Sequence, residues 1–525
     1  MALKEKIKGN RQSTKPAEKR TTESSVSSHE DEEKKVYCDN ICFPLMYLHD
    51  EYYELACKVY DDFVEKLNIQ SQLTEEMVRE VVVKHISDYS LPKVALKNEI
   101  ADFVTDNLLF YGPLTTIMRI TGADLNDIIV NTKDYIDIIY AGQTIATPFC
   151  FRSEDELRRI INRMLATSNR KIDESSPIAS AKLPDGSRLE IQIPPVAANL
   201  NKDGEAGSYI TVRKFREIPF LFESLVDTQM IDIKMAYFLL KAIQGKLNIV
   251  VSGGTSSGKT TFLNAITRFV DESDQLLTIE DTKEMKPQLP CHAIRSFETR
   301  PPNEEGAGAI SIESLLRTAL RSSPRRIIVG ECRGPEIVTM LNAMNTGHPG
   351  SMTTIHADDT KEAIVRIENM FLEARPTANM NFVRSQIVSA VDLIVQIVRF
   401  PDGRRRIVKI SEPEKRIEEN GVVSMLDLFE FERNVNVDDP MDSSGEFKAV
   451  STSIRSTTKM LQNGIILDKN IFNNDFEISR SMLVDELRAF HPKRMCGWKP
   501  NYMSEIVKAT QSSGGNLLGR WPNLQ

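Results

Sequence analysis

A glycine-rich segment in the middle of the chain, GGTSSGKTT, has the residue types and spacing of a phosphate-binding loop. It consists of Gly253, Gly254, Thr255, Ser256, Ser257, Gly258, Lys259, Thr260 and Thr261. In such a loop, backbone N–H groups and the N-terminus of the next helix bind phosphate oxygens. Lys259 is expected to reach the β- and γ-phosphates, and the Thr260 hydroxyl is expected to bind Mg²⁺. The segment therefore predicts a nucleotide site with ATP and Mg²⁺ as cofactors.

Acidic residues that end apolar runs are the candidates for hydrolysis, because a group must orient or deprotonate the attacking water. Glu331 follows RRIIVG, which would bring its carboxylate to the mouth of a sheet beside the loop. Glu280 and Asp281 follow QLLTI and are our candidates for Mg²⁺ and water. The common form of the motif has an acid before Glu331, but Gly330 stands there, so metal contacts must come partly from elsewhere. The alternatives are that Glu331 only caps the next helix and that the other two acids are structural.

His356 ends a third apolar run, GSMTTI. A neutral imidazole at this strand end can donate a hydrogen bond to the γ-phosphate or to Glu331, and so distinguish ATP from ADP. An isolated histidine is often structural. Its expected register with Glu331 favours a functional role.

Strands and helices alternate from about residue 231, which is the pattern of a parallel sheet with crossover helices. The run LNIVV would deliver the phosphate loop, and TFLNAITRF has the apolar spacing of a helix. Further candidate strands are QLLTIE, HAIRSF, RRIIVG, SMTTIH, DLIVQIV and RRIVKI. We expect one α/β nucleotide-binding domain over 231–411.

The remaining parts of the chain differ in composition. Residues 1–35 contain no aromatic residue and few aliphatic ones, which predicts a disordered tail. A helical module is expected over 36–90 and a smaller α+β domain over 91–230. A C-terminal appendage is expected over 412–525. The basic run Arg404–Arg406 is typical of a solvated hairpin turn.

Composition limits the classes of function. The chain has 525 residues, of which 41% are hydrophobic and 27% charged, and its formal net charge is -8. No uninterrupted apolar stretch approaches the roughly 18 to 20 residues of a membrane span, so we expect a cytoplasmic protein. The acidic balance disfavours direct nucleic-acid binding, which depends on surplus positive charge.

Four segments resemble, in order and spacing, the Walker A, aspartate-box, Walker B and histidine-box regions of the type II/type IV secretion ATPases. They are GGTSSGKTT, TIEDTKE, RPPNEEGAGAISIESLLRTALRSSPRRIIVGECRG and TGHPGSMTTIHA. Within that superfamily the chain is most similar to the ATPases that assemble Flp (tight-adherence) pili, over roughly Leu91 to Gly464. The resemblance implies a RecA-like P-loop ATPase domain with a mostly parallel sheet, preceded by a smaller α+β N-terminal domain and a helical module.

The resemblance also implies a homo-hexameric ring that holds each nucleotide between an N-terminal and a RecA-like domain. Arginines of the N-terminal domain approach the phosphates in that family. The matching residues are Arg188 in DGSRLE and Arg213 in ITVRKF. A fixed guanidinium can neutralise charge that develops on the γ-phosphoryl group. Surface arginines paired with local acids are the alternative.

The implied function is that of an ATP-hydrolysing motor at the inner face of the cell membrane. Such a motor would act on a polytopic inner-membrane platform protein and power pilus assembly or protein secretion. A motor of conjugative DNA transfer or effector secretion would share every catalytic residue and is the alternative. A nucleotide-gated adaptor and a nucleic-acid translocase are less favoured.

Overall fold

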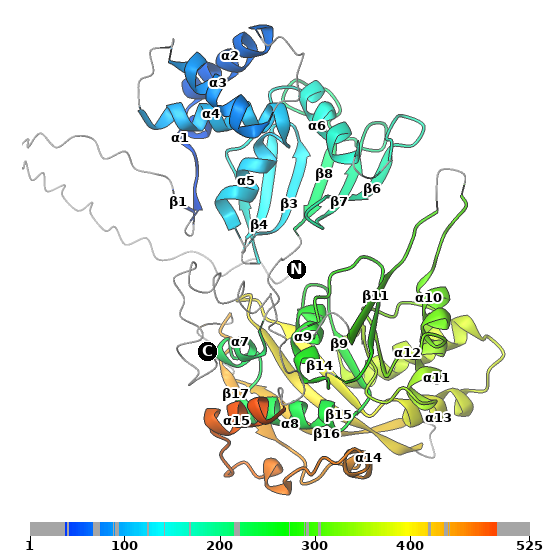
Figure 1. Ribbon diagram of the computed structural model, residues 1–525. Helices are drawn as coiled ribbons and strands as arrows, with labels where there is room; N and C mark the ends of the chain where they lie inside the picture. The colour runs from blue at the N-terminus through cyan, green and yellow to red at the C-terminus, as the bar shows by residue number, and fades with distance from the viewer. Residues whose placement is uncertain are drawn as a thin grey trace, which may run out of the picture. The chain divides into compact units, whose positions relative to one another are not determined.

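The computed structural model describes residues 37–38, 41–66, 74–87, 89, 94–122, 125–140, 142–166, 168, 170–214, 221–271, 273–287, 289, 293–302, 306–417, 422–434, 439 and 441–490 (Figure 1). The expected tail over 1–35 lies outside these residues. The chain forms two compact units, Met1–Thr121 and Gly122–Gln525. None of the helices in these ranges is long and apolar enough to cross a bilayer.

The first unit is helical. Its elements are β1 (Tyr37–Cys38), β2 (Ile41–Cys42), α1 (Leu45–Leu48), α2 (Asp50–Lys66), α3 (Glu75–Ile86), α4 (Val94–Leu109) and α5 (Pro113–Thr121). The ring of Phe103 on α4 makes edge contacts with Tyr47, Tyr53 and Tyr60 of α1 and α2. Because α4 supplies the centre of this aromatic core, the unit extends to Thr121, beyond the module expected over 36–90.

The second unit begins with a six-stranded antiparallel sheet, here called the N-terminal sheet, in the order β5-β4-β3-β8-β7-β6. Its strands are β3 (Leu125–Thr132), β4 (Tyr135–Tyr140), β5 (Gln143–Ala146), β6 (Ile178–Lys182), β7 (Arg188–Gln192) and β8 (Tyr209–Arg213), and α6 (Glu154–Ala166) lies beside them in Figure 1. Buried and partly exposed residues alternate along β7, as expected for a strand with one covered face. Arg213 is directly opposite both Arg188 and Asp127, so these three side chains share a face.

The rest of the second unit is built on a nine-stranded sheet, here called the nine-stranded domain, in the order β11-β10-β12-β13-β9-β14-β15-β16-β17. The pairs from β11 to β14 are parallel and those from β14 to β17 antiparallel. The strands are β9 (Ile249–Gly253), β10 (Leu276–Glu280), β11 (Ile294–Glu298), β12 (Arg326–Val329), β13 (Met352–Ile355), β14 (Leu393–Arg399), β15 (Arg405–Ile417), β16 (Val423–Arg433) and β17 (Gly445–Ala449). Each candidate strand from LNIVV to RRIVKI corresponds to one of β9 to β15, which confirms the expected mostly parallel α/β fold.

Helices cover both faces of this sheet. They are α7 (Phe222–Asp227), α8 (Ile233–Gln244), α9 (Lys259–Ile266), α10 (Ile312–Ala319), α11 (Glu336–Asn345), α12 (Thr360–Ala374), α13 (Met380–Ala390), α14 (Thr457–Gln462) and α15 (Arg480–Phe490). Ile249 and Val251 of β9 pack into a core with α8 and α9, whereas Val250 packs into a second core with α11, α12 and α13. An apolar run without alternation is typical of a parallel strand buried on both faces.

The sheet continues beyond residue 411, where a separate appendage was expected to begin. That boundary lies inside β15, and the pairing of β15 with β16 and of β16 with β17 adds residues 412–417, 423–433 and 445–449 to the same sheet. At the β17 edge, the Asn474 side chain accepts from Ala449 N at 2.9 Å and donates to Ala449 O at 3.0 Å. The amide of Asn474 thus takes the place of a neighbouring strand at that residue.

Candidate nucleotide site

The glycine-rich segment forms a strand–loop–helix unit in which β9 ends at Gly253 and α9 begins at Lys259. A Cβ atom on Gly253 would lie 2.3 Å from the carbonyl oxygen of Ile397 in the neighbouring strand, so only glycine fits. Gly258 has φ 96° and precedes the first turn of α9. This left-handed conformation favours glycine and turns the chain into the helix. The N-terminus of α9 therefore faces the loop, as an anion site requires.

Lys259 and Ser257 provide polar groups inside the loop. Lys259 Nζ donates to the carbonyl oxygens of Gly253 and Gly254, at 2.8 Å each. Burial lowers the pKa of Lys259, which marks an ammonium group that gains from a nearby anion. Ser257 Oγ is buried and has no hydrogen-bond partner among the described residues. A phosphate oxygen in the loop would satisfy both groups.

Glu331 lies just beyond β12, and its carboxylate contacts an imidazole and a guanidinium group. Its Oε1 is 2.9 Å from His356 Nε2, and its Oε2 accepts from Arg333 Nη2 at 2.7 Å. Burial and the charge of Lys259 lower the pKa of His356, so its imidazole is neutral at pH 7. The structure thus brings together Glu331 and His356, which the sequence placed in register. Lys259 Nζ, 3.5 Å from His356 Nε2, joins this group to the phosphate loop.

Glu280 ends β10 and is almost fully buried, with 4% of its surface exposed. Its Oε1 accepts from the backbone N–H groups of Glu284 and Met285 at 3.0 Å each. Its Oε2 is buried and has no hydrogen-bond partner among the described residues. Burial raises the pKa of Glu280 to about 7. This carboxyl group therefore changes charge near neutral pH.

The oxygen donors expected for Mg²⁺ fall into two environments. Glu280 keeps a buried oxygen available, whereas Asp281 is about half exposed and lies 3.9 Å from Arg333 Nη1. Thr260 is in the first turn of α9. Mg²⁺ in nucleotide sites takes one or two protein oxygens and completes its shell with phosphate and water, so this small donor set fits the ion.

The two arginines assigned from the N-terminal domain have different surroundings. Arg188 Nη2 is 3.0 Å from Glu284 Oε1 and 3.3 Å from the carbonyl oxygen of Thr282. Arg213 Nε instead pairs with Asp127 Oδ1 at 3.1 Å, inside its own sheet. Arg188 therefore contacts the segment that holds Glu280. Arg213 is paired with an acid of its own sheet, as in the alternative that these residues are surface arginines paired with local acids.

The run Arg404–Arg406 is not a solvated turn throughout. Arg404 is exposed, but Arg405 Nε donates to the carbonyl oxygen of Ser256 in the phosphate loop at 3.0 Å. Arg406 is buried, and its guanidinium lies 4.8 Å from the ring centre of Phe431. Successive residues of a strand point to opposite faces, which separates Arg405 from Arg406, whereas Arg404 precedes the strand. Sequence reasoning missed the contact of Arg405 with the loop, because it predicted the strands but not which of them are neighbours.

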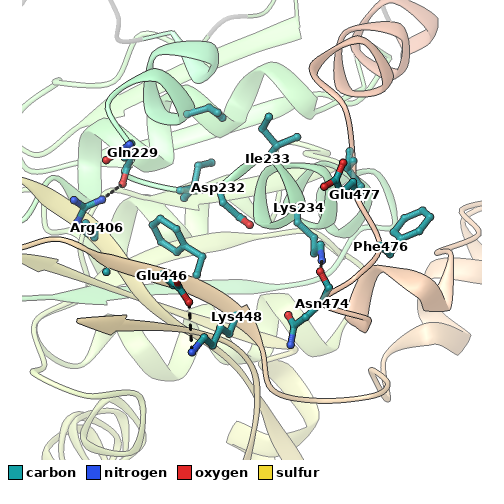
Figure 2. A pocket seen from close by; sticks show the side chains of 15 residues that line it. Gln229, Asp232, Ile233, Lys234, Arg406, Glu446, Lys448, Asn474, Phe476 and Glu477 are labelled. Carbon is teal, nitrogen blue, oxygen red and sulfur yellow. Dashed lines mark hydrogen bonds and ion pairs between the residues drawn. The ribbon is translucent and has the colours of Figure 1, made fainter. Parts of the chain in front are cut away.

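A pocket of about 680 Å³ lies elsewhere in the second unit, between the start of α8, the edge of β17 and residues 474–478 (Figure 2). None of its lining residues belongs to the phosphate loop. Lys234 donates to the carbonyl oxygens of Asn473 and Asn474, and Asp232 accepts from Met235 N at the start of α8. The two bonds of Lys234 attach α8 to the C-terminal segment.

Residues 113–459 match the family model of the type II/IV secretion system proteins. The chain belongs to this family. A Mycobacterium tuberculosis protein named for conjugal transfer is 30% identical over 291 residues, which are 54% of this chain and 80% of the relative. Conjugal transfer protein TrbB of Rhizobium radiobacter is 35% identical over 237 residues, 44% of this chain and 67% of TrbB. The VirB11 ATPase of the Brucella suis type IV secretion system is 24% identical, with a TM-score of 0.32 over 58% of this chain and 96% of that structure.

The family match confirms the resemblance to the type II/type IV secretion ATPases that the four motif segments indicated. All four motif segments lie inside the matched residues. The family match and the strand–loop–helix unit together identify an ATPase of the type II/IV secretion family.

Proposed function

We propose that this secretion-family ATPase is a motor that converts the state of its nucleotide into movement between the N-terminal sheet and the nine-stranded domain. The contact of Arg188 with Glu284 carries the proposal. Arg188 begins a strand of the N-terminal sheet, while the N–H group of Glu284 holds the Glu280 carboxylate. Glu284 therefore links the Glu280 carboxylate at the nucleotide site to Arg188 of the N-terminal sheet.

In the proposed reaction, water attacks the γ-phosphorus as the bond to ADP breaks, giving ADP and phosphate. Glu331 orients the water and takes its proton, and neutral His356 donates a hydrogen bond beside it. Lys259 and the N-terminus of α9 neutralise phosphate charge. Thr260, Glu280 and Asp281 would hold Mg²⁺, which supplies positive charge to the phosphates when bound. Arg188 and Arg213 stay as predicted contributors from the N-terminal sheet.

The proposed partner is a polytopic inner-membrane platform protein. The motor would act as a homo-hexamer, in the cytoplasm and attached to the inner face of the membrane through that partner. The motif similarity supports pilus assembly of the Flp type or protein secretion as the output. The conjugal-transfer names of two relatives favour a second candidate, a motor of conjugative DNA transfer or effector secretion.

Glu331→Gln tests the motor against a nucleotide-gated adaptor. The variant should bind MgATP like the wild type and release phosphate at least about 100-fold more slowly, because it cannot accept the proton of the water. Lys259→Ala is the control that should lose MgATP binding. Unchanged phosphate release in Glu331→Gln would refute the proposed role. Stimulation of hydrolysis by single-stranded DNA would instead favour the translocase.

Copurification with inner-membrane components of the same cells tests the partner. ATP hydrolysis by the wild-type protein should rise when the cognate platform protein is added in membranes. If no magnesium-dependent ATP consumption occurs with or without that component, the motor proposal fails.

A further inference from the structure

Two arginines face each other across the hairpin that joins β14 to β15. Arg399 is the last residue of β14, Arg405 is the first of β15, and they are directly opposite in the antiparallel register. The turn between them is closed by Phe400 N, which donates to Arg404 O at 2.8 Å, and by Gly403 N, which donates to Phe400 O at 2.9 Å. The hairpin therefore fixes the two arginines side by side.

These opposite arginines contact different parts of the second unit. Arg399 Nη2 donates to the carbonyl oxygen of Gly142, in the turn between β4 and β5 of the N-terminal sheet. Gly142 has φ +86°, and a Cβ atom there would lie 3.1 Å from Arg399 Nη2. Arg405 Nε donates to the carbonyl oxygen of Ser256 in the phosphate loop at 3.0 Å. The hairpin thus joins the phosphate loop to the N-terminal sheet.

The tip of the hairpin is supported from β16 and the segment before β17. The Phe400 ring lies 5.9 Å from that of Phe431, and the Arg433 guanidinium lies 5.6 Å from the centre of the Phe400 ring. Ser443 Oγ donates to Asp402 Oδ2. Because these contacts hold the tip from the side, a displacement of one strand end is passed to the other.

The charges in this arrangement favour a polyanion at the loop. Like charges directly opposite on two strands are destabilising. The Arg405 side chain also lies over Gly258, with its Cδ 3.0 Å from the position of a Cβ atom there, at the positive N-terminus of α9. A cation is unfavourable at that end of a helix. Phosphate groups beside Arg405 would offset both repulsions.

We propose that Arg405 binds the polyphosphate of the nucleotide and that the Arg399–Arg405 pair passes the presence of that charge to the β4–β5 turn. The inference rests on the proposed function, since it concerns the same phosphate loop. When phosphate neutralises Arg405, repulsion on Arg399 falls and its bond to Gly142 O becomes stronger. By linkage, the contact of Arg399 with Gly142 must strengthen nucleotide binding by the same factor.

Arginine variants of the full chain test the binding role. Arg405→Ala should weaken binding of a slowly hydrolysed ATP analogue about tenfold, and more than it weakens ADP binding, because one charge-assisted contact is lost. Arg405→Lys should keep most of the affinity, since the charge remains. Arg404→Ala is the matched control: it removes a neighbouring arginine that pairs with Asp402, and it should bind both nucleotides like the wild type.

Hydrogen exchange of the β4–β5 turn tests the coupling. In the wild type, the ATP analogue should slow exchange of residues 139–146 by about two- to fivefold, the range expected for a cross-strand charge pair. Arg399→Ala should remove this protection and weaken analogue binding by a similar factor. In the double variant Arg399→Ala/Arg405→Ala, the two losses of affinity should not add.

Each outcome has a separate meaning. If Arg405→Ala binds the analogue as tightly as the wild type does, or if the two losses are additive, the inference is overturned while ATP hydrolysis by the wild type still supports the proposed function. If the wild type binds the analogue and shows these arginine effects but does not consume ATP, the inference stands and the motor proposal fails.

Discussion

The side chain of Glu280 fills the space beside Gly330, the residue that directly follows the neighbouring strand β12. A Cβ atom on Gly330 would lie 3.0 Å from Glu280 Cγ, because β10 and β12 pair in parallel and bring these residues together at their carboxyl ends. An acid commonly precedes the strand-end glutamate in Walker B sequences, and here Glu280 supplies a carboxylate from the adjacent strand. The glycine is thus explained by the acid next to it.

Gly330→Ala should reduce ATP hydrolysis. The added methyl group would push Glu280 out of place, and we expect kcat to fall about tenfold while the affinity for the ATP analogue stays near that of the wild type. Gly334→Ala is the control in the same segment, because its Cβ atom would make an ordinary contact at 3.6 Å from Glu336 Oε2. Steady-state hydrolysis and analogue titration check both variants. Wild-type kcat in Gly330→Ala would contradict the packing argument.

The pKa of Glu280 predicts a pH-dependent difference in stability. Its pKa is raised from 4.5 to about 7 in the folded protein, so between these pH values the folded state binds more protons than the unfolded state. The free energy of unfolding therefore falls as pH rises through this window, and the full loss is present above it. The glutamine of Glu280→Gln does not titrate, so this pH-dependent loss of stability should be absent from the variant.

Urea unfolding of wild type and Glu280→Gln at pH 5 and pH 8 measures that difference. Relative to the wild type, the glutamine variant should gain on the order of 3 kcal/mol between the two pH values. A difference that is the same at both pH values would show that this carboxyl group does not titrate in the window.

Arg188→Ala should affect catalysis more than stability. Its ion pair with Glu284 is partly exposed, so we expect a change of at most about 1 kcal/mol in the free energy of unfolding. Loss of a guanidinium that supports the site should lower kcat about 100-fold. Lys182→Ala is the matched control, since Lys182 forms a similarly exposed pair with Glu298 at 3.0 Å. If the two variants hydrolyse ATP at the same rate, Arg188 has only a structural role.

The opposite end of β12 carries a buried ion pair that should matter for stability alone. Arg326 is fully buried, and its guanidinium donates to Asp274 Oδ2 at 2.8 Å and to Ile243 O at 2.9 Å. Arg326→Ala removes the buried partner of Asp274, which then keeps only its partly exposed pair with Lys246 Nζ at 3.0 Å, and should reduce the free energy of unfolding by about 3 kcal/mol. The control is the exposed neighbour Arg325. The free energy of unfolding of Arg325→Ala should stay within about 0.5 kcal/mol of the wild-type value. Urea unfolding of the two variants measures these free energies, and equal values for Arg326→Ala and Arg325→Ala would contradict the prediction.

The local parts of the site could be predicted from the sequence. The loop from Gly253 to Thr261 is recognisable because strand, glycines, lysine and helix are contiguous, and the strands ending in Glu280, Glu331 and His356 are apolar runs of ordinary length. The burial of Glu280 and the contact of Arg405 with Ser256 could not be predicted. Both depend on which strands are neighbours and in what register, and composition and periodicity do not determine this.

The extent of the sheet was missed for a related reason. The strand–helix alternation breaks before two later segments, GVVSMLDLFEFER and GEFKAV. These segments were therefore expected in a separate appendage. In the structure β16 and β17 pair in sequence with β15, because antiparallel neighbours need only short connections. Alternation of strands and helices therefore identified the parallel half of the sheet but not its antiparallel end.

The amide of Asn474 has a consequence for the behaviour of this protein at high concentration. An exposed edge strand is a template on which strands of other molecules can align, the first step toward fibrous aggregates. At Ala449 an incoming strand would first have to displace a side chain that already satisfies both backbone groups. The Asn474 amide therefore hinders strand pairing between two molecules at this residue of β17.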